Sequence, residues 1–195
     1  MDGDELDGDG DSDEALVARA GRGDRLAASV LIARHSPKVL SLCGRILFDR
    51  AGAEDAAQET FLKLWENAAR WRPQGARLET WLYRVAANAC FDRLRKRKRE
   101  APEEDGGELI DGDPSADERL AAADRRRAVE AALAGLPERQ RMVVTLCHYQ
   151  EMSNIEAAAT MAISVEAVES LLSRARRSLK EQLMGMREEL LEGAR

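Results

Sequence analysis

The chain has 195 residues, of which 34% are charged and 4% aromatic, and its net charge is −6. Abundant Ala, Leu, Glu and Arg favour helices over an extended sheet, and 44% hydrophobic residues suffice for packed cores, which excludes disorder of the whole chain. No apolar run approaches the roughly 18 residues of a membrane span, and the acidic N-terminus is unlike a signal peptide. We therefore expect a cytoplasmic, all-α protein without membrane insertion.

The charge is divided unevenly along the chain. Residues 1–14 carry −8 and residues 100–118 carry −9, so the remainder carries +11. Both acidic segments are rich in glycine and lack hydrophobic periodicity, which predicts flexibility. The expected organisation is an acidic disordered tail (1–13), an N-terminal helical bundle (14–99), a flexible acidic linker (100–118) and a C-terminal helix-turn-helix domain (119–192).

The first domain is predicted to open with a long helix that begins at Asp24. A second helix is predicted to begin near residues 54–55, where two carboxylates suit the positive end of a helix dipole. Asp55, Gln58 and Glu59 then lie on faces of this helix away from its apolar residues.

The next predicted helix, about 78–98, has a polar stripe and ends with six basic residues in positions 93–99. Its stripe consists of Arg84, Asn88, Asp92, Arg95 and Arg99. Solvated helix ends usually carry fewer basic residues, so this ending favours a phosphate-binding surface. Four aromatic residues lie in or just before this helix. Aromatic residues usually pack in the hydrophobic core, but those beside basic residues can also stack on unpaired bases of single-stranded nucleic acid. They are Trp71, Trp81, Tyr83 and Phe91.

In the second domain, a helix over 119–134 is predicted to end at Gly135, and another to begin at Pro137. Ser153 and Glu156 form a capping box for a short helix, and Ser164 caps a long final helix after a brief turn. This arrangement is typical of a helix-turn-helix, although an ordinary αα-hairpin gives similar signals. The outward residues of the final helix could contact bases and phosphates. They are Glu166, Ser170, Ser173, Arg174, Arg177 and Lys180.

Several strings in the chain occur in the order typical of one protein family. They are EALVARAGRGD (14–24), AEDAAQETFLKLW (53–65), TWLYRVAANACFDRLR (80–95), LPERQR (136–141) and VEAVESLLSRAR (165–176). Over nearly all of residues 14–183 the chain resembles the extracytoplasmic-function (ECF) sigma factors, small bacterial transcription initiation subunits.

The resemblance implies a protein without enzymatic activity or cofactor that binds core RNA polymerase, directs it to promoters and assists their melting. By this resemblance, Asp55, Gln58 and Glu59 contact the polymerase. The residues implied to face the −10 element, including its opened strand, are Trp81, Tyr83, Arg84, Asn88, Asp92, Arg95, Lys96 and Arg97. Those implied to lie at the −35 element are Ser164, Ala167 and Ser170 near bases and Arg174, Arg177 and Lys180 at phosphates.

The resemblance further implies that the 100–118 linker threads the RNA exit path of the polymerase. It also implies that the chain directs transcription of stress-response genes and is itself controlled by an anti-sigma factor. One departure is Glu169, which stands where the family often has lysine, so a phosphate contact is in doubt. Another is the Ala157-Ala158 pair in the first helix of the helix-turn-helix, where Ile-Ala is usual. We hypothesise that the acidic tail shields the basic domains from nonspecific DNA.

Two other classes of function are alternatives to a promoter-specificity subunit. A stand-alone helix-turn-helix regulator with a helical sensor domain would bind duplex DNA without polymerase, but it leaves the helix with Asp55, Gln58 and Glu59 unexplained. A metal-dependent helical enzyme would need soft ligands at suitable spacing, which His35, His148 and the three scattered cysteines (Cys43, Cys90 and Cys147) do not provide.

Overall fold

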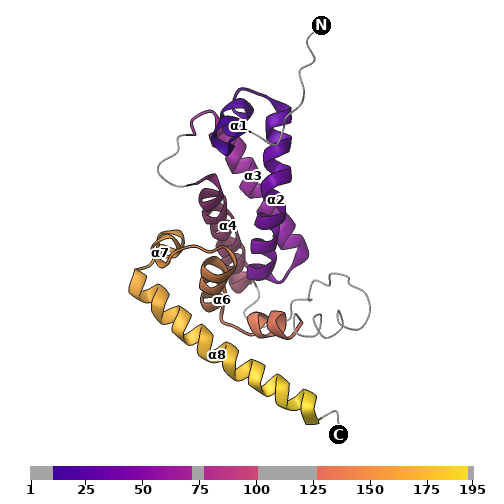
Figure 1. Cartoon of the computed structure of the whole chain (residues 1–195), viewed down its shortest axis with the longest axis vertical. Coiled ribbons are helices and arrows are strands. Elements are labelled where there is room, and N and C mark those ends of the chain that lie inside the picture. The colour runs from indigo at the N-terminus through magenta and orange to yellow at the C-terminus, as the bar shows by residue number, and fades with distance from the viewer. Residues whose placement is uncertain (1–10, 72–76, 101–126, 193–195) are drawn as a thin grey trace.

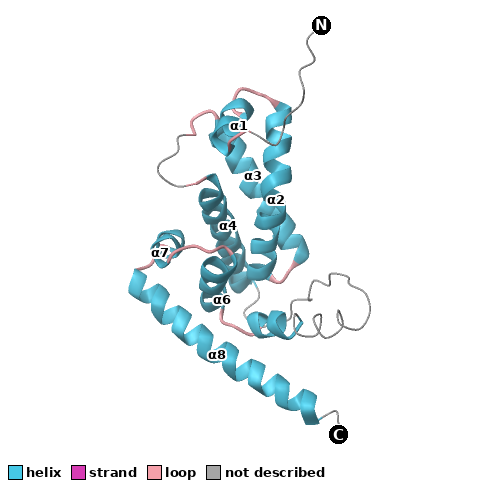
Figure 2. Cartoon of the chain, viewed as in Figure 1, coloured by secondary structure: helices cyan, strands magenta, loops and turns pink. Residues whose placement is uncertain are grey.

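The computed structural model describes residues 11–71, 77–100 and 127–192. Every element within these ranges is a helix (Figure 2), which confirms the all-α prediction. Most of the acidic tail, and the acidic linker apart from Glu100, lie outside the described residues. None of the described helices combines the length and apolarity needed to cross a bilayer.

The N-terminal bundle consists of α1 (Asp13–Ala20), α2 (Arg25–Leu47), α3 (Arg50–Ala68) and α4 (Leu78–Glu100), shown in Figure 1. Asp24 caps α2 as expected, because its carboxylate accepts hydrogen bonds from the backbone N–H groups of Leu26 and Ala27 at 3.0 and 3.2 Å. The central helix α2 packs against α1, α3 and α4. The shared core includes the fully buried side chains of Leu31, Leu42, Ile46, Leu64 and Leu82.

Two boundaries in this bundle differ from those predicted. The helix α3 begins at Arg50, several residues before the expected start, because Phe48 ends α2 in a left-handed conformation (φ 47°) and Asp49 is already extended. Folded structure also starts before residue 14, since Ser12 caps α1 and its hydroxyl accepts a hydrogen bond from the backbone N–H of Ala15.

The C-terminal domain contains a helical segment over 127–134, α6 (Glu138–Val144), a π-helical turn η1 (Thr145–Tyr149), α7 (Asn154–Met161) and α8 (Val165–Glu192). The predicted capping box is present, since Ser153 and Glu156 exchange hydrogen bonds at the start of α7. Ala162 turns the chain in a left-handed conformation (φ 51°) between α7 and α8. This short helix, tight turn and long helix form the predicted helix-turn-helix.

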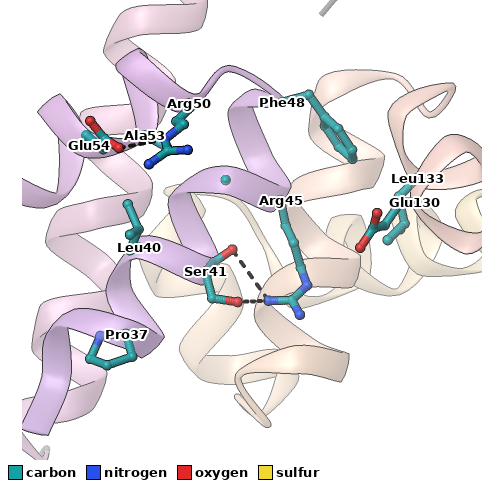
Figure 3. Close-up of a pocket in the computed structure, with 11 residues that line it drawn as sticks. Pro37, Leu40, Ser41, Arg45, Phe48, Arg50, Ala53, Glu54, Glu130 and Leu133 are labelled. Atoms are coloured by element: carbon teal, nitrogen blue, oxygen red, sulfur yellow. Dashed lines mark hydrogen bonds and ion pairs between the residues drawn. The ribbon is translucent and has the colours of Figure 1, made fainter. Parts of the chain in front are cut away.

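The two domains lie against each other (Figure 1). The helix α2 contacts α6 and η1, and α4 contacts α7. Arg45 of α2 lies over the ring of Tyr149 in η1, with its guanidinium carbon 4.3 Å from the ring centroid. These contacts between the domains join residues that are far apart in the sequence. A cavity of about 540 Å³ remains between α2, the start of α3 and the segment 127–134 (Figure 3).

Candidate nucleic-acid interface

The outer face of α4 carries the polar stripe that the sequence predicted. Arg84, Asn88, Asp92 and Arg95 are all exposed, while the opposite side of the helix is buried in the bundle. Asp92 forms an ion pair with Arg95, three residues further along, at 2.8 Å. The stripe therefore presents both hydrogen-bonding groups and positive charge to the surroundings of the helix.

The basic end of α4 is partly used inside the protein. The Arg93 side chain is half-buried and donates to Glu59 of α3 at 2.7 Å. Arg97 is ion-paired with Asp49 at 2.6 Å, while Lys96 is exposed. Two of the basic residues at 93–99, which the sequence suggested as a phosphate-binding surface, therefore also hold α4 against the start and the middle of α3.

The two aromatic residues proposed for the opened strand occupy different environments. Trp81 is half-buried, and its ring meets that of Trp71 edge-on with centroids 5.2 Å apart. Tyr83 is 5% exposed and its hydroxyl donates to Glu79 at 2.7 Å. Burial and this carboxylate raise the pKa of Tyr83. In this arrangement Trp81 reaches the surface, whereas Tyr83 does not.

The expected polymerase-binding face lies on α3. Asp55 and Gln58 are exposed, as the spacing predicted. Glu59 is half-exposed and accepts hydrogen bonds from Lys63 and Arg93, both at 2.7 Å. These two cations lower the pKa of Glu59. Sequence reasoning missed this bridge because Arg93 is 34 positions away.

The N-terminal part of α8 presents the second predicted surface. The Ser164 hydroxyl caps the helix by accepting from the backbone N–H of Ala167 at 3.2 Å. Val168, Leu172 and Ala175 are buried on the seam that holds α8 against the domain. In the proposed −35 surface, Arg174, Arg177 and Lys180 are exposed, whereas Ala167 and Ser170 are half-buried, Ser170 less exposed than its predicted outward position implied.

The described residues include no group of three or more His, Cys, Asp or Glu side chains arranged to hold a metal ion. His35 is buried and lies 2.9 Å from Asp13, which fixes α1 on α2. Cys43 and Cys90 are buried in the core.

Comparisons with known proteins give the family. A family model described as Sigma-70 region 2 matches residues 31–100, and one described as Sigma-70, region 4 matches residues 126–179. The chain is 32% identical to the RNA polymerase sigma-H factor of Pseudomonas aeruginosa, covering 89% of this chain and 94% of that protein. It is 31% identical to the ECF RNA polymerase sigma-E factor of Haemophilus influenzae, covering 88% and 95%.

A solved structure is also similar: the sigma factor RpoE in complex with the anti-sigma factor NepR from Bartonella quintana. Its TM-score is 0.62 at 26% identity, covering 78% of this chain and 94% of that chain. The region 2 match takes in most of α2 with α3 and α4, and the region 4 match takes in the helix-turn-helix. The chain therefore belongs to the ECF sigma factors of the sigma-70 family, non-enzymatic subunits with which RNA polymerase initiates transcription.

Proposed function

We propose that this sigma factor binds core RNA polymerase through the outer face of α3 and contacts promoter DNA through α4 and α8. The observation that carries the proposal is the exposure of three polar surfaces on helices whose opposite sides are buried in the two domains. Asp55 and Gln58 supply the polymerase-facing groups, with Glu59 at the edge of that face.

The two DNA-facing helices have different tasks in this proposal. The stripe of Arg84, Asn88 and Arg95 on α4 contacts the −10 element, and Trp81 at the surface stacks on a base of the opened strand. The start of α8 enters the major groove at the −35 element, where Arg174 and Arg177 hold phosphates. Melting needs no covalent chemistry, because holding unstacked bases lowers the free energy of the open state.

Control by an anti-sigma factor in the cytoplasm belongs to the same proposal. Its support is the related sigma factor from Bartonella quintana, whose solved structure is a complex with an anti-sigma factor. We expect an inhibitor of this chain to compete with core polymerase, and stress-response genes to form the regulon.

Run-off transcription tests the proposal. Core polymerase free of any sigma factor is given fragmented genomic DNA of the source bacterium, with and without this protein. New discrete transcripts are expected, and their start sites define both promoter elements. If core that is active with another sigma factor yields no transcripts with this one, promoter recruitment is refuted, and binding to free DNA then tests a stand-alone regulator.

Variants of α3 assign the polymerase surface in the same assay. Asp55→Asn combined with Gln58→Ala should lower both core binding and transcript yield. Asn67→Ala is the matched control, because Asn67 is exposed on α3 about 120° around the helix from Asp55. Equal core binding by all three proteins would place the polymerase contact elsewhere.

A further inference from the structure

The start of α8 carries two carboxylates, and only one of them has a partner among the described residues. Glu166 accepts hydrogen bonds from its own backbone N–H and from the hydroxyl of Ser164, which lowers the pKa of its carboxyl. It therefore helps to cap the helix at the end where the helix dipole favours negative charge. Glu169 is exposed, and its side chain forms no hydrogen bond or ion pair with any residue that the structure describes.

Glu169 is also unfavourable for the helix that carries it. It is the fifth residue of α8, beyond the first turn in which the dipole stabilises a carboxylate. The residues three and four positions away, with which it could pair along the helix, are Val165, Glu166, Leu172 and Ser173. None of these is a cation, and Glu166 repels it. A residue that breaks the local rules in this way points to a function at its position.

The exposed side of α8 is the side that meets DNA in the function proposed above. Val168 and Leu172 are buried and hold the opposite side against the domain, while α8 runs along the outside of the molecule (Figure 1). Glu169 is exposed together with Arg174 and Arg177, which lie about 8 and 12 Å further along the axis. Phosphates repel a carboxylate on this side, so Glu169 lowers the affinity for DNA of any sequence unless it has a specific partner there.

The major groove of DNA offers a carboxylate few partners. An ionised carboxylate only accepts hydrogen bonds, and in this groove guanine presents N7 and O6 and thymine presents O4, all of which are acceptors. Adenine presents its N6 amine beside the acceptor N7, which repels the second carboxylate oxygen, whereas cytosine presents its N4 amine alone. A glutamate near the N-terminus of a recognition helix, where base contacts are made, is therefore matched to cytosine.

We propose that Glu169 is a specificity-determining residue, which accepts a hydrogen bond from the N4 amine of one cytosine in the −35 element and disfavours guanine and thymine at that position. This role rests on the proposed function, because it needs the start of α8 to lie in the major groove. It accounts for an exposed carboxylate that destabilises its own helix and is repelled by the DNA backbone.

Holoenzyme binding to altered promoters tests this role. A promoter identified by run-off transcription supplies the probe, and each base pair of its −35 element is replaced in turn by the other three. Wild type is compared in competition binding with Glu169→Gln and Glu169→Arg. The matched control is Glu166→Gln, which removes the same charge from the same end of α8, but from the carboxylate that serves the helix cap. Equal helix content by circular dichroism shows that all four proteins are folded.

Wild type should prefer cytosine at one position of the −35 element, on either strand, by about fivefold or more over guanine and thymine. At that position Glu169→Gln should favour adenine, because an amide both donates to N7 and accepts from the N6 amine. Glu169→Arg should favour guanine, because a guanidinium donates to both O6 and N7. Glu166→Gln should keep the preference for cytosine.

A base-reading role for Glu169 is overturned if both Glu169 variants keep the base preference of wild type at every −35 position. It is also overturned if Glu169→Gln weakens binding to core polymerase and leaves base preference unchanged, since the carboxylate then faces the polymerase. Either result leaves α8 assigned to the −35 element. If the wild-type holoenzyme discriminates between bases at no −35 position, that assignment fails and the role of Glu169 fails with it.

Discussion

Glu59 is the residue for which the structure and the family resemblance suggest different roles. The resemblance assigns it to the polymerase, but here it bridges Lys63 on its own helix and Arg93 on α4. We predict that Glu59→Gln, which keeps the shape and removes the charge, lowers the stability of the N-terminal bundle. Asp55→Asn, an exposed change on the same helix, should leave stability within about 0.5 kcal/mol of wild type.

The expected loss for Glu59→Gln is about 1 kcal/mol. Exposed ion pairs contribute about 0.2–1 kcal/mol each, and the Glu59 side chain is 36% exposed, so solvent screens both of its pairs. The pair with Arg93 should contribute more, because Arg93 is the less exposed cation, at 28% against 42% for Lys63. A double-mutant cycle of Glu59→Gln with Arg93→Gln should therefore show a coupling of about 0.5 kcal/mol.

The pH dependence of the stability difference between wild type and Glu59→Gln is a second test. Because Lys63 and Arg93 lower the pKa of Glu59, its contribution is fully present above the ordinary glutamate pKa of about 4.3. It is lost as the pH falls through the lowered pKa of the folded state. The difference between wild type and Glu59→Gln should therefore be largest at neutral pH and vanish in acid.

Urea unfolding followed by tryptophan fluorescence measures this directly. All three tryptophans, Trp65, Trp71 and Trp81, lie in the N-terminal bundle, so the signal reports on that domain alone. Equal unfolding midpoints for wild type and Glu59→Gln at pH 7, or a difference that persists unchanged in acid, would refute the structural role of the bridge.

Three further predictions concern the C-terminal domain and the cysteines. Arg174→Ala should lower by about one the slope with which the logarithm of the −35 DNA binding constant falls against the logarithm of salt concentration, and Glu169→Lys should raise that slope. Titrations at several salt concentrations measure the slope, and an unchanged slope would place these side chains away from phosphates. Ser153→Ala removes a helix cap and should cost about 1 kcal/mol in thermal unfolding followed by circular dichroism, an unaltered melting curve being the contrary result. Hydrogen bonding with Cys43 and burial raise the pKa of Cys90. A thiol reagent should therefore modify half-buried Cys147 first and Cys90 only when the protein unfolds. Peptide mass spectrometry measures the order of modification, and early modification of Cys90 would contradict its burial.

The sequence by itself determined the features that depend on near neighbours in the chain. The caps at Asp24, Ser153 and Ser164 each act within three residues, and the seam of α8 follows from the helical repeat of three and four. The polar stripe of α4 was found for the same reason. The all-helical class and the two-domain organisation of the family could be predicted from these local patterns together with the order of the motifs.

Tertiary structure decided the contacts between residues that are distant in the sequence. Glu59 forms an ion pair with Arg93 because α3 and α4 pack side by side. Tyr83 is buried and donates a hydrogen bond to Glu79. Arg45 meets Tyr149 across more than one hundred positions, in an arrangement that no local spacing encodes. Which residues form such pairs depends on the angles at which the helices cross, and those angles depend on the shapes of the packed helix faces. Only the folded chain therefore shows which charged side chains remain available for a partner.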